Sequence, residues 1–423
     1  MKILWMINTI LPQIAETQGM ECVSGGGWLV QLANRLGSQE GIELTVVYPT
    51  YDDKVCYGKT DLFVYYGVPE KRIPECKFNK KREKQYRNII AETTPDIVHI
   101  WGSEYVHSYT MARAFGKPDR TILSVQGLIS IISEHYSDGL PERVKHSWTL
   151  RDLLRFDNIA QQQKHFERRG SYEQKLIAGL RYVIGRTEWD YACTKMVNQN
   201  ISYFKCNEIL RTEFYRSKKW SLEKCKRHSL FLTQIYYPVK GFHFLLKALP
   251  FILKKYPDTM IYVAGENIID APKLKAKVKT GSYARYLRKT IDEQNLSAHI
   301  TFLGNLNAEQ IVTQMLMSHV FVLPSTIENS SNSLSEAMLL GLPCVASNVG
   351  GTGSLLTHHK EGLLYQCSDS YMLAYSIMRL FADDELCRKI SDAATMRASA
   401  DHDETMSTLS YLDVYNAVLT GGK

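Results

Sequence analysis

Short apolar runs alternate with segments of helical periodicity along the first half of the chain. The runs cover residues 3–7, 44–48, 97–100 and 121–125, and residues 28–36 carry apolar side chains at helical spacing. Continuous apolar runs of this length, separated by amphipathic helices, are typical of buried strands in a parallel sheet covered by helices. The pattern therefore predicts an α/β domain in this half of the chain.

The same alternation begins again after residue 228 and predicts a second α/β domain. Ligands of open α/β sheets bind beyond the carboxyl ends of the strands, so we expect functional residues in the loops that follow them. Strands are expected at residues 230–232, 260–264, 299–303, 320–323 and 344–346, and helices at 244–256, 308–317 and 333–340.

Chain length and local composition set the expected domain boundaries. A chain of 423 residues is too long for one ordinary core. We expect a first domain over residues 1–207, a basic and irregular linker over 208–228, and a second domain over 229–403. Residues 404–423 are predicted to form a helix that crosses back to the first domain, and residues 138–180 a charged helical excursion. The expected architecture is two Rossmann-like domains whose parallel sheets face each other across a cleft.

The composition predicts a soluble cytoplasmic protein. Hydrophobic residues make up 44% of the chain and charged residues 22%, and no apolar run approaches the roughly 18–20 residues of a membrane-spanning helix. The apolar start soon meets Asn8 and lacks a small-residue cleavage site, which favours a buried strand over a signal sequence. The nine cysteines form no C-x-x-C pair, which argues against a zinc site and indicates reduced thiols.

Basic residues cluster at two places in a chain of net charge +7. Residues 77–87 hold six basic side chains against one acidic, and residues 205–227 hold eight against three. A solvated helix face is one explanation, and attraction to anionic lipid headgroups or nucleic acid is the other. Because no recognised nucleic-acid-binding module accompanies the clusters, we expect no nucleic-acid partner. Lys80, Lys81 and Arg82 are predicted to contact an anionic membrane at its inner face.

The most informative stretch runs from residue 324 to residue 338. Glu328 lies in the loop after an expected strand, and Glu336 follows eight residues later in the expected first turn of a helix. The small polar residues between them let backbone N–H groups approach an anion at the helix N-terminus. A carboxylate that accepts hydrogen bonds from vicinal hydroxyls is a natural ribose ligand. The alternative explanation of Glu336 is a carboxylate that only complements the helix dipole.

This stretch resembles the E-x7-E motif of the retaining glycosyltransferases of family 4, in the variant E-N-S-x-N-S-x-x-E-A-M. Five further segments are similar to motifs of that family and occur in the same order along the chain. They are Gly25-Gly26, Asp96-Ile97-Val98-His99, Pro238-Val239-Lys240-Gly241, Val263-Ala264-Gly265 and the run 341–351. The resemblance implies the GT-B fold and transfer of a sugar from a nucleotide-diphosphate sugar with retention at the anomeric carbon.

The resemblance also implies roles for the matching residues. Glu336 would bind the ribose hydroxyls of the donor, and Glu328 would contact the transferred sugar. Lys240 would neutralise the diphosphate, and Gly25 and Gly26 would let backbone N–H groups reach the same phosphates. Glu328 and Lys240 are the implied catalytic residues. The implied donor-binding residues are Gly25, Gly26, Gln126, Arg186, Lys240, Gly265, Glu328, Ser330, Ser331, Asn332 and Glu336.

Two positions depart from the family pattern. The arginine that usually precedes the lysine of P-x-K-G is missing, and Arg186 is a hypothetical substitute for it. The family's T-V-H-G reads Ser124-Val125-Gln126-Gly127, and Gln126 can hydrogen-bond a hydroxyl but cannot take up a proton. His99 is the remaining motif histidine. A buried histidine at a strand end is the favoured explanation, and His99 is also the one named candidate for contact with the acceptor.

The expected chemistry needs no cofactor and no metal. The chain has no D-x-D motif and no evident nucleophile–base pair. This agrees with the front-face mechanism that the resemblance implies, in which the leaving diphosphate takes the acceptor's proton. The expected acceptor is a glycan or a lipid-linked glycan.

Two alternatives belong to other functional classes. A nicotinamide-dependent oxidoreductase needs G-x-G-x-x-G directly after the first strand, but positions 25, 27 and 30 are Gly, Gly and Val. A catalytically degenerate sugar-nucleotide-binding subunit is favoured by Gln126 and the missing arginine, whereas the intact Glu328, Glu336 and Lys240 favour an enzyme.

Overall fold

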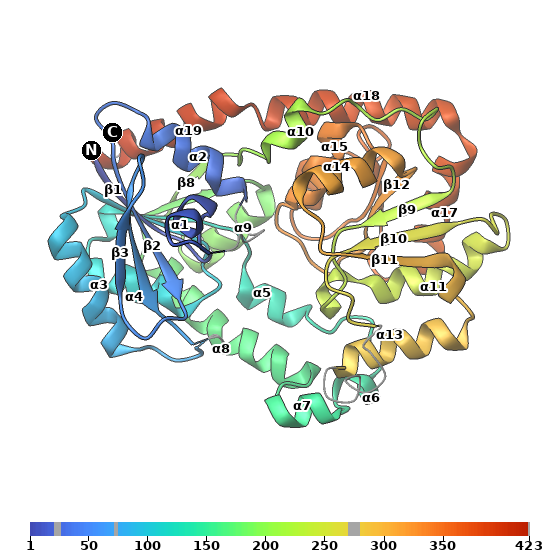
Figure 1. Cartoon of the computed structure of the whole chain (residues 1–423), viewed down its shortest axis with the longest axis horizontal. Helices are drawn as coiled ribbons and strands as arrows, with labels where there is room; N and C mark the ends of the chain where they lie inside the picture. Colours follow the sequence, from blue (N-terminus) through green and yellow to red (C-terminus); the bar gives the residue numbers. More distant parts are fainter. Residues whose placement is uncertain (21–26, 72–74, 270–279, 422–423) are drawn as a thin grey trace. The chain divides into compact units, whose positions relative to one another are not determined.

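The computed structural model describes residues 1–20, 27–71, 75–269 and 280–421. By its internal contacts the chain divides into two compact units, each with its own sheet and covering helices (Figure 1). Both sheets are built mainly from parallel strands, which confirms the prediction of two α/β domains.

The two units are assembled from separated segments of the chain. Unit 1 combines Met1–Ile131, Phe166–Arg211 and His402–Lys423, and unit 2 combines Ile132–His165 and Thr212–Asp401. The last helix, α19 (Glu404–Leu419), therefore belongs to the same unit as the first strand.

Residues 132–165 group with unit 2, whereas the predicted boundary at residue 207 keeps them in the first domain. Polar contacts explain the grouping. The carboxylate of Asp152 accepts a hydrogen bond from the backbone N–H of Ser282 at 3.0 Å, and His243 Nε2 lies 3.0 Å from the carbonyl oxygen of Asp138. The charged and helical character of this segment is visible in the sequence, but amphipathicity does not tell which sheet a helix covers.

Unit 1 is built on a sheet of eight strands within the described residues, in the order β3-β4-β2-β1-β5-β6-β7-β8. All neighbours pair in parallel except β3 and β4. The strands are β1 (Lys2–Met6), β2 (Glu43–Thr50), β3 (Cys56–Lys59), β4 (Val64–Pro69), β5 (Ile97–Trp101), β6 (Thr121–Ser124), β7 (Tyr182–Gly185) and β8 (Ser202–Lys205).

The helices of unit 1 cover this sheet on both faces. Among them, α19 packs on the β5 side of the sheet, where Tyr415 Oη accepts a hydrogen bond from Trp5 Nε1 at 3.0 Å. The helices are α1 (Pro12–Thr17), α2 (Gly27–Gly37), α3 (Lys80–Thr93), α4 (Val106–Phe115), η1 (Pro118–Arg120), α9 (Glu188–Val197) and α19, while α5 (Ile129–Glu134) and α8 (Ile159–Ala178) are each shared with unit 2.

Unit 2 is built on a sheet of six parallel strands within the described residues, in the order β11-β10-β9-β12-β13-β14. The strands are β9 (Ser229–Leu232), β10 (Met260–Ala264), β11 (Ile300–Gly304), β12 (Val320–Leu323), β13 (Cys344–Ser347) and β14 (Leu363–Tyr365). The central strands β9, β12 and β13 are buried along their whole length, which explains why they read as continuous apolar runs.

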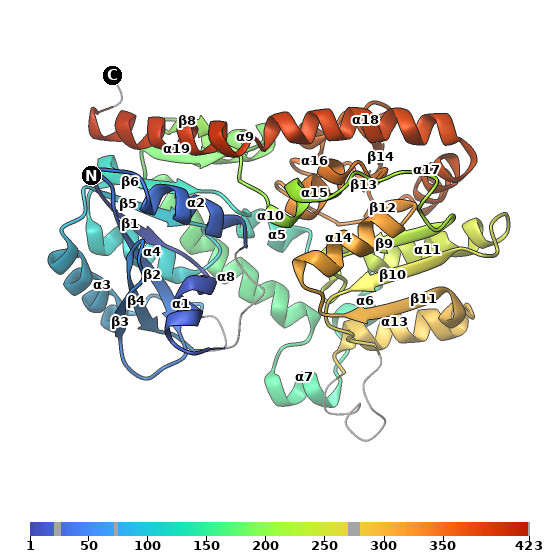
Figure 2. The same cartoon turned by 45° about the horizontal axis from the view of Figure 1, so that its top comes forward.

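Helices surround the sheet of unit 2, and the short helices α6 and α7 lie at its edge beside α13 (Figure 2). The helices are α6 (Glu142–Lys145), α7 (Leu150–Arg155), α10 (Thr212–Arg216), η2 (Pro238–Lys240), α11 (Phe242–Leu253), α13 (Ser282–Glu293), η3 (Ser297–His299), α14 (Ala308–Met317), α15 (Asn332–Leu340), α16 (Thr352–Leu355), α17 (Ser370–Ala382) and α18 (Asp384–Asp401).

Candidate functional site

An ion pair beyond the carboxyl end of β12 forms the centre of the candidate site in unit 2. Lys240 Nζ lies 2.7 Å from Glu328 Oε1, and Ser325 Oγ donates a hydrogen bond to the same oxygen at 2.7 Å. The side chains of Lys240 and Glu328 are 23% and 12% exposed, so both charges are accessible to a ligand. The structure thus brings together the two residues predicted to be catalytic, and it adds Ser325, which sequence reasoning missed.

A glycine fixes Lys240 in this position. Gly241 ends the η2 turn with φ +68°, and a Cβ at this residue would lie 1.8 Å from the carbonyl oxygen of Pro324. The backbone N–H of Thr326 donates to the carbonyl oxygen of Val239 at 2.8 Å, which ties the η2 turn to the loop after β12. Only glycine allows so close an approach at a positive φ. This close packing holds Lys240 against Glu328.

Two consecutive glycines, Gly350 and Gly351, pack against the backbone of Glu328. The backbone N–H of Gly351 donates to the carbonyl oxygen of Glu328 at 3.0 Å. Gly350 has φ +49°, and a Cβ there would lie 2.1 Å from the same oxygen. The loops after β12 and β13 are therefore packed backbone to backbone, which makes the position of the Glu328 carboxylate well defined.

The N-terminus of α15 lies a few residues beyond Glu328. Ser331 is its N-cap residue and accepts a hydrogen bond from the backbone N–H of Leu334 at 3.4 Å. Ser330 and Ser331 are buried, and Asn332 is the first residue of the helix. The first amides of a helix lack intrahelical partners and carry a partial positive charge, so this end suits an anionic ligand.

Glu336 is buried in α15, with 3% of its surface exposed. It is the fifth residue of the helix, because α15 begins at Asn332, and the expectation of a first-turn position is corrected by one residue. A carboxylate beyond the first turn interacts weakly with the helix dipole. The alternative explanation of Glu336, a carboxylate that only complements this dipole, therefore loses support.

Two further residues lie around the same end of the sheet. Gly265 follows β10 with φ +97°, and its backbone N–H donates to the carbonyl oxygen of Gly304 at 2.8 Å. Burial raises the pKa of the Tyr236 phenol, while the nearby charges of Lys240 and Glu266 respectively lower and raise it. Tyr236 is therefore a neutral phenol close to Lys240.

In unit 1 the structure joins the two residues that depart from the family pattern. Gln126 Nε2 donates to Glu208 Oε1 at 2.7 Å, and Arg186 Nη1 lies 2.8 Å from Glu208 Oε2. The side chains of Arg186 and Glu208 are 4% and 2% exposed. The charge of Arg186 is thus already balanced by Glu208, so any phosphate bound by Arg186 has to compete with this pair. Sequence reasoning counted Glu208 only as one acid within the basic linker.

His99 is enclosed in the core of unit 1, and its assignment to the acceptor is corrected. Its ring nitrogens lie 2.7 Å from Tyr415 Oη and 2.7 Å from Ser124 Oγ, and none of its surface is exposed. Burial holds the pKa of His99 well below its usual value, so the ring is neutral. With both nitrogens occupied, the ring cannot contact an acceptor, and the favoured explanation of a buried strand-end histidine fits the structure.

Gly25 and Gly26 lie outside the described residues. The next residue, Gly27, opens α2, and a Cβ there would lie 3.1 Å from the side chain of Arg211.

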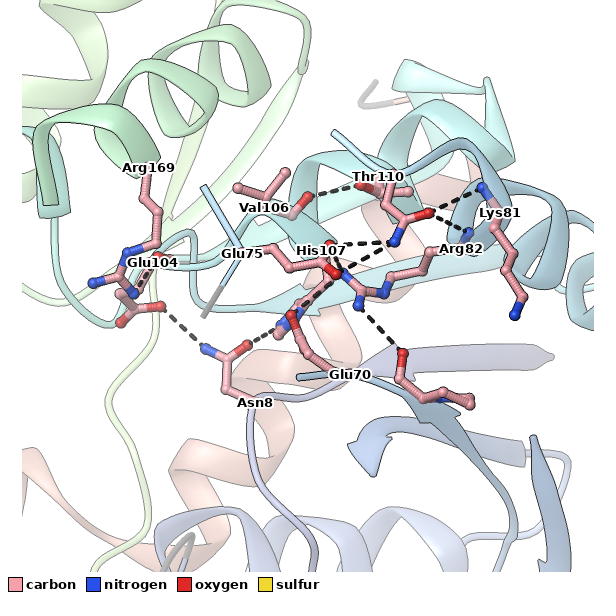
Figure 3. A network of polar contacts seen from close by, with 12 residues as sticks. Asn8, Glu70, Glu75, Lys81, Arg82, Glu104, Val106, His107, Thr110 and Arg169 are labelled. Atoms are coloured by element: carbon pink, nitrogen blue, oxygen red, sulfur yellow. Dashed lines mark hydrogen bonds and ion pairs between the residues drawn. The ribbon is translucent and has the colours of Figure 1, made fainter. Parts of the chain in front are cut away.

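A buried network of charges lies beyond the carboxyl ends of β1, β4 and β5 in unit 1 (Figure 3). Arg82 pairs with Glu70 at 3.3 Å and with Glu75 at 3.1 Å, and His107 Nδ1 lies 2.8 Å from Glu70. Because Arg82 is only 2% exposed, the prediction that it contacts a membrane is wrong. The neighbouring lysines Lys80 and Lys81 are exposed on α3.

The same edge of unit 1 holds a carboxyl group with an unusual pKa. Burial raises the pKa of Glu104 to about 7, with a smaller contribution from the charge of Glu173. Asn8 Nδ2 donates to Glu104 Oε2 at 3.1 Å, and Arg169 Nη1 donates to the carbonyl oxygen of Glu104 at 3.3 Å. Amide, guanidinium and carboxyl groups at the carboxyl end of a parallel sheet form a second polar site that the sequence did not reveal.

Within the described ranges, no group of three or more His, Cys, Asp or Glu side chains is arranged to hold a metal ion. No helix in the described part of the chain is long and apolar enough to cross a membrane.

Comparison with known proteins finds a family model that matches part of the chain. Residues 216–397 match the family model described as Glycosyl transferases group 1. The putative glycosyltransferase YtcC of Bacillus subtilis is 31% identical to this chain over 208 residues. The match covers 48% of this chain and 48% of YtcC, so the chain spans about half the length of this curated relative.

Solved structures share the fold over almost the whole chain. Sucrose-phosphate synthase of Thermosynechococcus elongatus has a TM-score of 0.73 at 15% identity and covers 99% of both chains. HepE of Anabaena, solved in complex with UDP-glucose, has a TM-score of 0.67 at 16% identity and covers 98% of this chain and 99% of its own. At these identities the likeness establishes the fold alone.

Proposed function

Because the chain belongs to the glycosyl transferases group 1 family through residues 216–397 and has the GT-B fold, we propose that it is a retaining, metal-independent glycosyltransferase. It moves a sugar from a nucleotide-diphosphate sugar to a glycan or a lipid-linked glycan, as in the biosynthesis of polysaccharides or glycoconjugates. The observation that carries the proposal is the Lys240–Glu328 pair beside the N-terminus of α15, inside the region that matches the family.

The donor is held by charge and by backbone amides. Lys240 exchanges its contact with Glu328 for the diphosphate, because a phosphate oxygen is a strong acceptor for an ammonium group. The amides at the start of α15, around Ser330, Ser331 and Asn332, lie next to the transferred sugar and its phosphate. Glu328, released from Lys240, accepts hydrogen bonds from the sugar, and Glu336 accepts them from the ribose hydroxyls.

Transfer relies on stabilising the charge of the leaving group. Negative charge develops on the diphosphate as the bond to the sugar breaks, and Lys240 with the helix N-terminus stabilises it. The diphosphate then takes the acceptor's proton, so the protein supplies no separate base. This scheme agrees with the neutral state of His99 and its burial away from any ligand.

A structural neighbour supports the choice of donor. HepE of Anabaena is solved with UDP-glucose, and we propose a UDP-sugar as the donor, with a GDP-sugar as the next candidate. The acceptor contacts unit 1, where Asn8, Glu104 and Arg169 offer donors and an acceptor to sugar hydroxyls. The chain acts in the cytoplasm, and the exposed Lys80 and Lys81 favour peripheral contact with the inner face of an anionic membrane.

One alternative function is favoured by a specific observation. Gln126 stands at the position of the family's histidine, and its amide donates to Glu208, which also pairs with Arg186. A catalytically degenerate subunit that binds sugar nucleotides without transferring them would tolerate this arrangement. Turnover separates the two functions, because an enzyme and a binding subunit both bind the nucleotide sugar, but only the enzyme breaks the bond between the nucleotide and the sugar.

The first test is thermal stabilisation by UDP, GDP, ADP, CMP and NAD. A ligand at about 100 times its dissociation constant adds roughly 2.7 kcal/mol to the folded state, which is readily measured. We expect one nucleoside diphosphate to stabilise the wild type and to lose most of this effect in Glu336→Ala. Glu309→Ala is the matched control, because Glu309 is an exposed glutamate near the start of α14 in the same unit. Stabilisation by NAD alone would instead support an oxidoreductase.

A further inference from the structure

An exposed apolar surface lies on the short helix α7 in unit 2. Leu150, Leu153, Leu154 and Phe156 are 49%, 60%, 68% and 65% exposed, and we call these four side chains the α7 surface. They fall within seven consecutive residues, at the edge of unit 2 beside α6 and α13 in both overall views (Figures 1 and 2). Scattered apolar residues on a surface are ordinary, but a cluster of large ones marks an interaction site.

Polar contacts hold α7 with its apolar side chains facing outward. Thr149 and Asp152 form a capping box at its N-terminus, and the buried carboxylate of Asp152 also accepts from the backbone N–H of Ser282 at 3.0 Å. Arg151 lies 3.0 Å from Asp152 and 2.7 Å from Asp157. The capping residues Thr149 and Asp152 are therefore buried against unit 2, whereas the apolar side chains of the helix are exposed, which is the reverse of an ordinary surface helix.

Phe156 is held in a strained backbone conformation. It caps the C-terminus of α7 with φ 52° and ψ 44°, in the left-handed region that favours glycine or asparagine. Its ring centroid lies 5.5 Å from that of Trp148, so the exposed Phe156 ring is placed next to a second aromatic side chain. A bulky residue kept in this conformation at a cost in stability is typical of a functional position.

The charged side chains from Glu142 to Asp157 carry a net charge of +1, from four basic and three acidic residues. Asp152 and Asp157 are engaged by Arg151, and Glu142 is engaged by Lys145 at 2.8 Å. Arg143 and Arg155 are exposed, and neither forms an ion pair with any described residue. Arg143 and Arg155 thus flank the exposed leucines and phenylalanine, and the charge of Arg155 also acts on Asp157.

We propose that the α7 surface docks unit 2 onto an anionic lipid bilayer. Leucine and phenylalanine enter the boundary between headgroups and acyl chains, and Arg143 and Arg155 meet the headgroup phosphates. A stable protein interface buries about 800 Å² on each partner, far more than four side chains on one projecting helix present. None of these residues belongs to the proposed donor site, so this docking stands independently of sugar transfer.

The test is flotation of the full chain with liposomes of phosphatidylcholine, alone or mixed with phosphatidylglycerol. The triple variant Leu153→Ser/Leu154→Ser/Phe156→Ser should lose at least about tenfold in its partition coefficient on the mixed liposomes. Arg143→Ala/Arg155→Ala should lose about fivefold for each charge removed and show less dependence on salt.

A matched control keeps the assay specific. Tyr371 and Tyr375 are 71% and 53% exposed on α17 of the same unit, and Tyr371→Ser/Tyr375→Ser should float like the wild type. Phe156→Gly should float less well and melt at a higher temperature, because glycine adopts the left-handed conformation without strain. Unchanged stabilisation by UDP in the triple variant shows that the donor site is intact, which separates failure of docking from failure of the proposed function.

Two outcomes would overturn the docking proposal. One is equal flotation of the wild type and the triple variant. The other is a wild type that self-associates or binds a protein partner in size-exclusion chromatography, does not float, and becomes monomeric in the triple variant. The second result would assign the α7 surface to a protein interface instead.

Discussion

Replacing Lys240 with methionine removes the charge at the centre of the proposed donor site while keeping most of the side chain's length. A hydrogen bond between an ammonium group and a phosphate contributes about 1.5–3 kcal/mol. In the free protein, however, Lys240 is already 2.7 Å from Glu328, and the diphosphate has to replace this contact.

The ion pair sets how much of that energy appears in binding. With side chains 23% and 12% exposed, the pair is partly screened by solvent and contributes about 1 kcal/mol. The net loss in Lys240→Met is then about 0.5–2 kcal/mol, so the dissociation constant of UDP should rise roughly 2- to 30-fold. The lost pair should also lower the melting temperature by about 2–4 °C.

The reciprocal variant separates the two roles of the pair. Glu328→Gln removes the competitor of the diphosphate, so UDP should bind as tightly as in the wild type or up to about fivefold more tightly. Transfer should fall nevertheless, because Glu328 is proposed to contact the sugar. No other assigned role of Glu328 predicts this divergence between nucleotide affinity and turnover.

Isothermal titration calorimetry with UDP measures these effects directly. Lys289→Met is the control, because Lys289 is 61% exposed and pairs with Glu293 on the surface of α13. It should leave UDP binding unchanged. If Lys240→Met binds UDP with the affinity of the wild type, Lys240 does not hold the diphosphate and the reasoning is refuted.

Three further predictions follow from the geometry. Gly241→Ala should destabilise the protein by more than about 2 kcal/mol in urea unfolding, because it combines a positive φ with a clash against Pro324; Gly304→Ala, with φ +72° and no atom within 4 Å of a Cβ, isolates the conformational cost at about 1–2 kcal/mol. Burial raises the pKa of Glu104 in the folded protein to about 7. Between the lower pKa of Glu104 in the unfolded chain and this value, the folded state binds more protons than the unfolded state, so the stability that the protonated carboxyl contributes is lost as pH rises toward 7. Glu104→Gln should abolish this loss, and equal pH dependence of unfolding in both proteins would contradict the assignment. Turnover should persist in a chelator such as EDTA, and its abolition would show that a metal is required.

The central strands of both sheets could be predicted because they are buried on two faces. The residues of β9, β12 and β13 are buried without interruption, and such segments produce continuous apolar runs. The strands β3, β4, β7, β8 and β14 were not predicted; among them β3 and β8 are partly exposed edge strands of four residues, which give no comparable signal.

The motifs that carry the family resemblance also identified the parts of the donor site that are close in sequence or fixed by glycine. Lys240 and Glu328 were expected together from two separate motifs, and the close packing of Gly241 on Pro324 explains why the P-x-K-G pattern includes its glycine. These contacts depend on backbone geometry that is tied to residue type.

Other parts depend on long-range contacts that no local pattern encodes. Glu208 joins Gln126 and Arg186 from three separate segments, and Asn8 meets Glu104 only because β1 and β5 are neighbours in the sheet. The burial of Arg82 could not be inferred either, since its partners Glu70 and Glu75 precede its helix and a run of basic residues is usually exposed.

The most direct test of the central claim is NMR observation of the sugar released from UDP-glucose and other nucleotide sugars during the first turnovers. A retaining transferase is expected to give the α-anomer first, in an amount equal to the UDP released, and Glu328→Gln should suppress it. First appearance of the β-anomer would contradict the retaining mechanism. Tight binding of UDP without release of sugar from any donor or to any acceptor would contradict catalysis itself.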